Sequence, residues 1–433
     1  MIHDLIPIDF RTIGNIFSSL RSRNYRIYFT GQGISLIGTW MQNIALSWLV
    51  YRLTGSVFLL GLIGFTSQIP VFVLTPFTGV VTDRYNRLHI MILTQVFFML
   101  HALTMALLVL FNVIEVWHII GLSLVFGIIS AFDAPARQSL VIDLIDNRAD
   151  LGNAIALNSA IFNSARLIGP AIAGVTIAIV GEGICFLLNT LSFVAVIIAL
   201  FQIKLPKQEK TIQTGNFKQS LTEGINYAFH SMPIRTLILL LSISSLIGLS
   251  YIVLLPAYAK EILRGNADTL GFLMSAMGAG ALIGALYMAN RKTVLGLGRL
   301  ISINSISLGV TIALSSFSGK LPVSMIIFFF SGISMVLFLS SVNTMLQTIT
   351  DEDKRGRVMS FYSMALMGIG PIGNLLAGTV ASWIGIPYTL LAGGIVTLLS
   401  GIWFEMKRKT LRKYVRSIYA TKGILPGLTD NIT

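Results

Sequence analysis

The chain has 433 residues, of which 54% are hydrophobic and 11% are charged, whereas about a quarter of the residues of an ordinary soluble domain are charged. The mean hydropathy is +0.80. These values exclude a soluble globular enzyme, a disordered chain and a fibrous protein. A transmembrane helix needs about 20 apolar residues, so twelve helices would leave room only for short loops and modest tails.

Twelve apolar segments follow one another along the chain, and we interpret each of them as a membrane-spanning helix. A backbone that is exposed to lipid must satisfy its own hydrogen bonds, and barrel strands would be shorter and alternating. The expected spans are 25–50, 57–81, 90–111, 116–136, 156–179, 183–203, 235–258, 270–290, 299–318, 321–348, 358–382 and 385–406. Residues 1–24 are polar and basic, and we expect no cleavable signal peptide in them.

The basic residues predict how the spans are oriented. Of the 31 lysines and arginines, 26 fall in the tails and loops on the side of the N-terminus and four on the opposite side. Loops rich in lysine and arginine face the cytoplasm. We therefore expect both termini to be cytoplasmic, and the net charge of +13 to reflect topology and anionic lipid rather than a nucleic-acid partner.

The longest internal polar stretch, 204–234, divides the spans into two sets of six. The expected organisation is an N-terminal tail, two six-helix halves joined by a cytoplasmic linker, and a basic cytoplasmic C-terminal tail, with bounds 1–24, 25–203, 204–234, 235–406 and 407–433. In the linker, Phe217, Leu221 and Ile225 recur at helical spacing. This spacing is typical of an amphipathic helix on the inner leaflet and equally of an ordinary packed linker helix.

The two halves contain a weak internal repeat. Residues 141–154 can be aligned with 345–358 at an offset of 204, and the same offset places Gly169 on Gly373 and Gly174 on Gly378. Two pseudo-symmetric halves are the layout of a transporter that rocks around a substrate site between them.

The sharpest local motif lies between spans 2 and 3 and has the form G-x-x-x-D-R-x-x-R. Its members are Gly79, Asp83, Arg84 and Arg87. Glycine allows close helix approach, and a short loop with these charges can form ion pairs that hold one conformation. Asp133 and Arg137 are one turn apart on span 4 and can join this cluster. We interpret the set as a conformational latch, and expect Pro135 to end the regular helix.

The motif resembles motif A of the major facilitator superfamily, with Asn86 in place of the second glycine. Other stretches resemble its transmembrane secretion effector branch of drug and siderophore exporters: Leu20–Arg26, Ala45–Trp48, Tyr51–Ser56, Asp133–Gln138, Gly152–Ser159 and Ala165–Pro170. The resemblance extends to about residue 405. It implies a twelve-helix fold with alternating access, a bacterial-type inner membrane, protons as the coupling ion, and an engagement of Asp83 with Arg137.

Span 5 carries the only arginine or lysine well inside a span. Such a charge is costly in lipid, so Arg166 should face the bundle interior or a water-filled cavity. Asn163 lies on the same helical face. The following Gly169-Pro170-x-x-x-Gly174 resembles the antiporter motif, which implies close packing and bending. We expect either a gating or anion-attracting role for Arg166, or a structural one.

Span 1 has a second polar stripe, consisting of Gln32, Thr39 and Gln42 with Asn43 beside them. A polar helix face inside a membrane points to other helices or to a cavity. Substrate contact and ordinary hydrogen bonding between helices are therefore both open for these side chains.

No aspartate or glutamate lies near the middle of any span, so His101 in span 3 is the one candidate proton site, although a hydrogen-bonded structural histidine is the alternative. We find no enzymatic motif, no clustered metal ligands and no cofactor motif, and the single Cys185 cannot form an internal disulfide.

The sequence thus predicts a secondary transporter that exports a bulky amphiphilic molecule such as a drug, a macrolide or a siderophore. We expect a monomer whose partners are this substrate, protons and membrane lipids. The alternatives are a transporter of the same fold that imports or flips a nutrient or lipid-like molecule, and a membrane sensor without transport activity.

Overall fold

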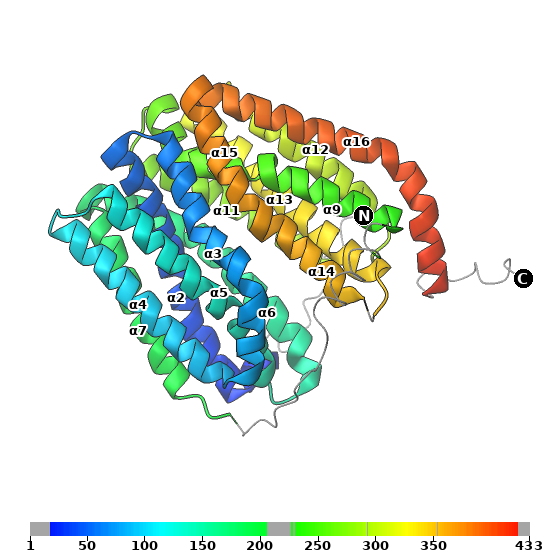
Figure 1. Cartoon of the computed structure of the whole chain (residues 1–433), viewed down its shortest axis with the longest axis horizontal. Helices are drawn as coiled ribbons and strands as arrows, with labels where there is room; N and C mark the ends of the chain where they lie inside the picture. The colour runs from blue at the N-terminus through cyan, green and yellow to red at the C-terminus, as the bar shows by residue number, and fades with distance from the viewer. Residues whose placement is uncertain (1–17, 206–226, 228–229, 292, 353, 423–433) are drawn as a thin grey trace, which may run out of the picture.

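The structure is a computed structural model that describes residues 18–205, 227, 230–291, 293–352 and 354–422, without the side chains of Pro76, Gly79, Val80 and Asp83. The predicted amphipathic linker helix lies outside these residues. The described chain is helical almost throughout (Figure 1).

Six long helices form the first half of the molecule. They are α2 (Arg23–Thr54), α3 (Val57–Arg84), α4 (Arg87–Leu110), α5 (Val116–Asp143), α6 (Leu151–Val180) and α7 (Glu182–Phe201). Short polar residues begin two of them. The Ser56 side chain accepts a hydrogen bond from the Leu59 backbone at the start of α3, and the Asn86 side chain accepts two at the start of α4.

The second half also crosses the bundle six times, but two of its crossings are irregular. The first crossing consists of α9 (Met232–Ile243), η3 (Ser244–Gly248), η4 (Ser250–Leu254), α10 (Leu255–Ala257) and η5 (Tyr258–Ile262). It is followed by α11 (Ala267–Asn290), α12 (Leu297–Ser315) and α13 (Leu321–Ile349). The fifth crossing joins α14 (Arg355–Ser363) to α15 (Ile369–Ile384) through the π-turn η6 (Met364–Gly368), and α16 (Ile386–Thr421) is the last.

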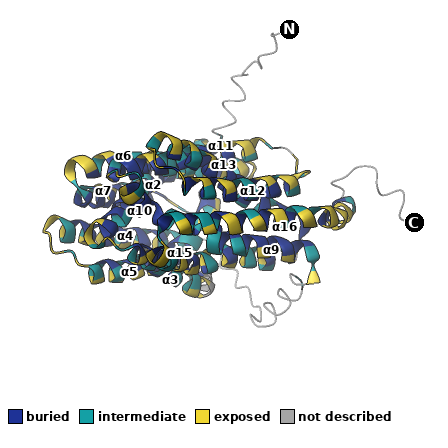
Figure 2. Ribbon diagram, turned by 90° about the horizontal axis from the view of Figure 1, so that it is seen from above, coloured by how far each residue is buried: buried dark blue, intermediate teal, exposed yellow. Residues whose placement is uncertain are grey.

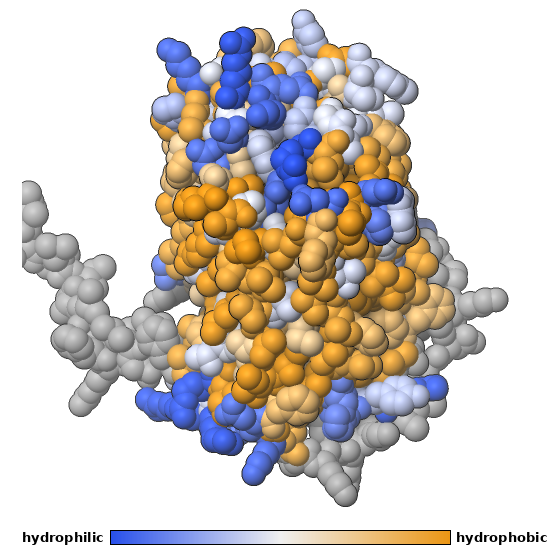
Figure 3. All heavy atoms as spheres, turned by 90° about the vertical axis from the view of Figure 1, so that its left-hand side faces the viewer, coloured by the Kyte–Doolittle hydropathy of each residue, from blue (hydrophilic) through white to orange (hydrophobic). Residues whose placement is uncertain are grey.

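These helices confirm the predicted all-α polytopic fold with twelve membrane-spanning segments. Among the described residues, eleven crossings are long and apolar enough to span a membrane by length and composition. The remaining one is α2, whose composition includes Gln32, Gln42 and Asn43. Figure 3 shows the broad apolar surface that such a protein offers to lipid, with hydrophilic side chains gathered at its two margins.

One boundary prediction was wrong, and one segment is more regular than expected. Pro135 does not end the fourth span, because α5 continues as a regular helix through Pro135 to Asp143. The proposed C-terminal tail from residue 407 is also helical up to Thr421, as part of α16 (drawn in red in Figure 1). This extension is held by packing, since Leu411, Val415 and Tyr419 are buried in the core of the second half.

The two ends of the bundle differ in charge, and we name them accordingly. The basic end is where α3 meets α4 and α11 meets α12, near Arg87 and Arg291; the opposite end is where α2 meets α3 and α6 meets α7, near Arg52 and Glu182.

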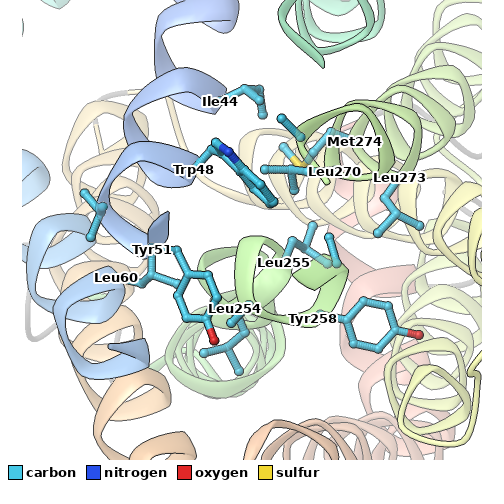
Figure 4. Close-up of a cluster of buried hydrophobic side chains, with 14 of the residues drawn as sticks. Ile44, Trp48, Tyr51, Leu60, Leu254, Leu255, Tyr258, Leu270, Leu273 and Met274 are labelled. Carbon is cyan, nitrogen blue, oxygen red and sulfur yellow. The ribbon is translucent and has the colours of Figure 1, made fainter. Parts of the chain in front are cut away.

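The described residues form three buried hydrophobic clusters, one shared by the two halves and one within each half. The largest cluster lies toward the opposite end and takes residues from both halves. In Figure 4, Trp48 and Tyr51 of α2 lie beside Leu254 and Leu255 of the second half and Leu270 of α11. Toward the basic end each half has a cluster of its own. The burial pattern seen from above agrees, with dark buried faces turned inward and exposed faces outward (Figure 2).

Glycines bring the helices of the two halves into direct backbone contact. A Cβ added to Gly271 of α11 would lie 2.9 Å from the Cα of Gly174 on α6. A Cβ added to Gly378 of α15 would lie 2.9 Å from the Cα of Gly61 on α3. Small residues permit such approaches between membrane helices. They form two inter-half seams, α6 with α11 and α3 with α15, near the opposite end.

Candidate functional site

Arg166 lies at the boundary between the two halves, halfway along α6. It is 15 residues from the first residue of the helix, Leu151, and 14 from the last, Val180, which is about 22 Å in either direction. Its backbone packs on the second half, because a Cβ on Gly278 of α11 would lie 2.7 Å from the Arg166 carbonyl oxygen. The sequence prediction that this charge faces the bundle interior agrees with this position.

The guanidinium of Arg166 contacts neutral groups from both halves. Its centre lies 5.6 Å from the ring centroid of Trp40 on α2, a cation–π distance. Its Nη2 atom lies 3.7 Å from the sulfur of Met335 on α13. The Nε atom is buried and has no hydrogen-bond partner among the described residues.

The wall beside the guanidinium is aromatic and polarizable. Phe162, one turn before Arg166, packs edge-on against Trp40 with 5.8 Å between the ring centroids, and remains 43% exposed. The Tyr251 hydroxyl forms a 2.7 Å hydrogen bond with Ser331 and lies 3.3 Å from the Met277 sulfur. Flexible methionine and aromatic surfaces adapt to differently shaped apolar ligands.

The polar stripe of span 1 divides between two environments. Gln42 is buried within the first half, where its Oε1 accepts a 2.7 Å hydrogen bond from Asn189 of α7. Gln32 is also buried, and its Oε1 has no partner among the described residues. Thr39 is half-buried and donates to the Ser35 carbonyl of its own helix, whereas Asn43 is exposed. None of these four side chains forms a hydrogen bond with Arg166.

His101 is part of the same buried network inside the first half. Its Nε2 lies 3.1 Å from the Leu122 carbonyl of α5 and its Nδ1 lies 3.5 Å from the Gln42 amide nitrogen. A neutral ring that donates from Nε2 and accepts at Nδ1 satisfies both contacts. Asn163, three residues before Arg166, donates to the Ser159 carbonyl of its own helix.

Toward the basic end, one ion pair joins α4 to α5 and a second lies within α5. Arg87 at the start of α4 pairs with Asp143 at the end of α5, with 3.0 Å between Nη1 and Oδ2. Arg137 pairs with Asp133 one turn before it, at 3.4 Å. Asp133 is buried and also accepts a 2.7 Å hydrogen bond from Gln95 of α4.

The remaining members of the expected latch are less constrained. Arg84 is exposed at the end of α3, and the side chain of Asp83 lies outside the described residues, so the expected engagement of Asp83 with Arg137 stays a prediction. The predicted packing glycines are in tight contacts. A Cβ on Gly169 would lie 2.5 Å from the Trp40 Cβ. Pro170 lies within an uninterrupted α6.

At the opposite end, polar bonds reinforce the apolar seam. The Tyr51 hydroxyl of α2 donates a hydrogen bond to the Glu261 carboxylate of η5, which joins the two halves. Arg52 pairs with Glu182 of α7 at 2.7 Å within the first half. The sequence did not single out Tyr51 or Glu261, because nothing local marks the partner of a polar residue at a helix end.

A polar cavity of about 660 Å³ opens at the basic end of the second half. It is lined by Thr344, Gln347, Thr348, Glu352, Arg355 and Lys422. The Lys422 ammonium donates to the carbonyls of Thr348 and Thr350, so that the end of α16 is tied to the end of α13. No group of three or more potential metal ligands occurs in the described part of the chain.

Two pseudo-symmetric helix bundles that are sealed at one end around a central charged side chain define a multi-pass membrane transporter of small molecules. The model of the family described as "Transmembrane secretion effector" matches residues 15–417. The chain therefore belongs to this family of major facilitator transporters, as its motifs indicated, and not to a class of enzymes.

Relatives with known names are transporters. The chain is 25% identical to the staphyloferrin A transporter of Staphylococcus aureus, over 90% of this chain and 98% of that one. It is 24% identical to the multidrug efflux pump Tap of Mycolicibacterium fortuitum, over 86% and 91%. A solved bacterial homolog of the human lysosomal transporter Spinster, in an inward-facing and unoccupied conformation, aligns with a TM-score of 0.65 at 12% identity, over 92% and 98%. This last likeness shows the fold.

Proposed function

We propose that the protein exports a bulky amphiphilic small molecule across a bacterial plasma membrane by alternating access. The observation that carries the proposal is the position of Arg166, which contacts side chains of both halves at mid-height while the halves are sealed on one side of it. The names of two relatives, the multidrug efflux pump Tap and a macrolide efflux protein, support export rather than uptake.

The proposed orientation places the basic end in the cytoplasm. Its support is the distribution of lysine and arginine, of which 26 of 31 fall on that side. The described conformation is then inward-facing, because the inter-half seams, the shared apolar cluster and the Tyr51–Glu261 bond are all near the opposite end. A substrate would reach Arg166 from the cytoplasm.

The latch proposal assigns Gly79, Asp83, Arg84, Arg87, Asp133 and Arg137 to the control of the cytoplasmic side. The Arg87–Asp143 pair supports it, since it joins the start of α4 to the end of α5, and so does Asp133, which pairs with Arg137 on α5 and accepts a hydrogen bond from Gln95 of α4. Asp143 is added to the set because it is the partner of Arg87.

The coupling ion is proposed to be the proton, with His101 as the candidate site. The geometry also supports the alternative, since both ring nitrogens face neutral groups of the first half rather than the substrate side chains. Gln32, Thr39, Gln42, Asn43 and Asn163 remain proposed cavity or gating residues, and the exposed Asn43 is the best placed of the span 1 group.

Accumulation of fluorescent compounds in cells without their own exporters tests the function. We expect lower accumulation with the wild-type protein than with the empty vector, and loss of the difference in Asp83→Asn, in Arg166→Ala and after a protonophore. The exposed Arg412→Gln serves as the matched control. Uptake into inverted vesicles gives the direction, and transport that only fills right-side-out vesicles would contradict export.

Two single-cysteine variants test the orientation, because the only native thiol, Cys185, is buried. Thr293 lies at the basic end between α11 and α12, and Gly319 at the opposite end between α12 and α13. An impermeant maleimide added to intact cells should label Gly319→Cys and spare Thr293→Cys. The reverse pattern would overturn the proposed topology.

A further inference from the structure

The charge at the centre of the molecule has no counter-charge. Among the described residues Arg166 takes part in no ion pair, and its contacts are an indole ring and a thioether. Removing a cation from water is costly unless it is paired and hydrogen-bonded. A cation–π contact offsets only part of that cost.

Five carboxylates of the described chain have polar partners other than Arg166. Asp133 and Asp143 pair with Arg137 and Arg87 near the basic end. Glu182 pairs with Arg52, Glu405 with Arg408, and Glu261 accepts the Tyr51 hydroxyl. No carboxylate of the described chain forms an ion pair with Arg166, so its positive charge is not neutralised by the protein.

The unsatisfied donor defines what would complete the site. The buried Nε–H of Arg166 has no acceptor, and its Nη2 points at a sulfur, which is a weak acceptor. A guanidinium offers two parallel N–H donors with the spacing of a carboxylate. An oxyanion on this fork would satisfy the Nε–H and neutralise the charge together.

We infer that the transported molecule carries a carboxylate that binds the guanidinium of Arg166, beside an apolar or aromatic body that lies against Phe162 and Trp40. This inference rests on the proposed transport function and names the chemical class of its substrate. The ring edge of Phe162, which is 43% exposed, supplies apolar surface next to the charge. A cationic amphiphile would meet the same apolar wall and be repelled by the arginine.

A matched pair of dyes tests the inference by binding, independently of transport. Rhodamine 110 carries a free carboxylate, and rhodamine 123 is its methyl ester, with the same ring system. Fluorescence polarization with the purified full-length protein in detergent gives both affinities. We expect rhodamine 110 to bind about tenfold more tightly than the ester, as a hydrogen-bonded charge pair requires.

The variants separate a substrate role from a structural one. Arg166→Gln should abolish the preference for the acid by weakening rhodamine 110 and leaving the ester unchanged, whereas Arg166→Lys should keep part of it. Arg412→Gln, on the exposed face of α16, is the matched loss of one charge and should retain the full preference.

Equal affinities in the wild-type protein, tighter binding of the ester, or no saturable binding of rhodamine 110 would overturn the inference. An equal loss for both dyes in Arg166→Gln would overturn it as well, because a packing role affects both. If the acid preference is present but neither dye is exported from cells, the inference stands and the proposed export fails.

Discussion

The hydroxyl of Tyr51 donates a hydrogen bond to the carboxylate of Glu261, and this bond joins the end of α2 in the first half to η5 in the second. It lies at the margin of the apolar cluster shared by the two halves, where Tyr51 also packs beside Leu254 (Figure 4). The seam around it is made of backbone contacts and aliphatic packing. A hydrogen bond at this place fixes the position of the two halves relative to each other more closely than such packing does.

Removal of that bond should favour opening at the opposite end. A cysteine at Leu60, whose side chain is 2% exposed and lies beside Tyr51, reports on this opening. In the Leu60→Cys background, we expect Tyr51→Phe to raise the rate of maleimide labelling about 3- to 10-fold, because one hydrogen bond is lost. Labelling of purified protein checks this. The control is Tyr388→Phe, at a tyrosine of the same end that is 68% exposed, and it should leave the labelling rate unchanged. If Tyr51→Phe also leaves the rate unchanged, the Tyr51–Glu261 bond does not hold the seam.

The α6–α11 seam should not tolerate a methyl group. A Cβ on Gly278 would lie 2.7 Å from the Arg166 carbonyl oxygen and 2.8 Å from the Leu167 Cα, both backbone atoms. We expect Gly278→Ala to lower stability by about 1–3 kcal/mol, seen as a lower melting temperature in detergent. The control is Gly121→Ala on α5, where nothing lies within 4 Å and alanine should be neutral or stabilising by up to about 1 kcal/mol. Equal melting temperatures for the two variants would contradict the seam.

The contribution of the Arg87–Asp143 pair to efflux should depend on opposite charges at the two positions and not on which position carries which charge. Arg87→Asp places two carboxylates together at the basic end, and we expect it to reduce efflux at unchanged expression. The double variant Arg87→Asp/Asp143→Arg restores the pair and should recover most of the activity. The pair is partly exposed, at 27% and 10%, so its coupling energy should be about 1 kcal/mol. Failure of the swap to recover efflux would assign another role to one partner.

His101 allows a clear choice between a structural and a proton-carrying role. Its two ring contacts, to Leu122 and Gln42, are worth about 1–2 kcal/mol of stability together. We expect His101→Gln to lower the melting temperature while the efflux that remains stays sensitive to a protonophore. The exposed His89→Gln is the control. Efflux that persists but no longer responds to the protonophore would instead identify His101 as the proton site.

The end of α16 should contribute to the stability of the second half. Leu411 is 3% exposed and packs in its core cluster, so Leu411→Asp should cost about 2–5 kcal/mol. Lys413→Asp, two residues further on the exposed face, is the matched introduction of a carboxylate and should have little effect. The melting temperatures of the two variants decide whether this segment is a tail or part of the fold.

The helices could be predicted from the sequence because their signal is local. Hydropathy along about 20 residues identifies a span wherever it lies, and each predicted span overlaps a helical crossing of the structure. The two departures from prediction have local causes as well. Proline at residue 135 was read as a stop, but a helix packed among its neighbours tolerates the lost bond. The amphipathic pattern after residue 407 was read as a tail because its burial depends on other helices.

The candidate site was only partly predictable, for a different reason. Arg166 was identified because a lone cation within a span is conspicuous. Trp40 and Met335 were missed, because an aromatic or thioether side chain near a charge looks the same in sequence as one in a core. For Gln42 the sequence left substrate contact and bonding between helices open, and its side chain bonds to Asn189 inside the first half. Helical periodicity shows that one face of a helix is polar, but it does not show which neighbouring helix or cavity that face contacts.

By itself, then, the sequence determined the number of spans and their arrangement in two halves. It also determined which end of the bundle carries most of the basic residues, and that Arg166 lies inside the bundle. Each of these features depends on the transfer of side chains between water and lipid. Only the tertiary structure decided that the halves are sealed at the Tyr51–Glu261 end and that Arg87 pairs with Asp143. Those contacts join residues up to 210 positions apart, and they arise from the way glycine-lined helices approach one another, which no local pattern encodes.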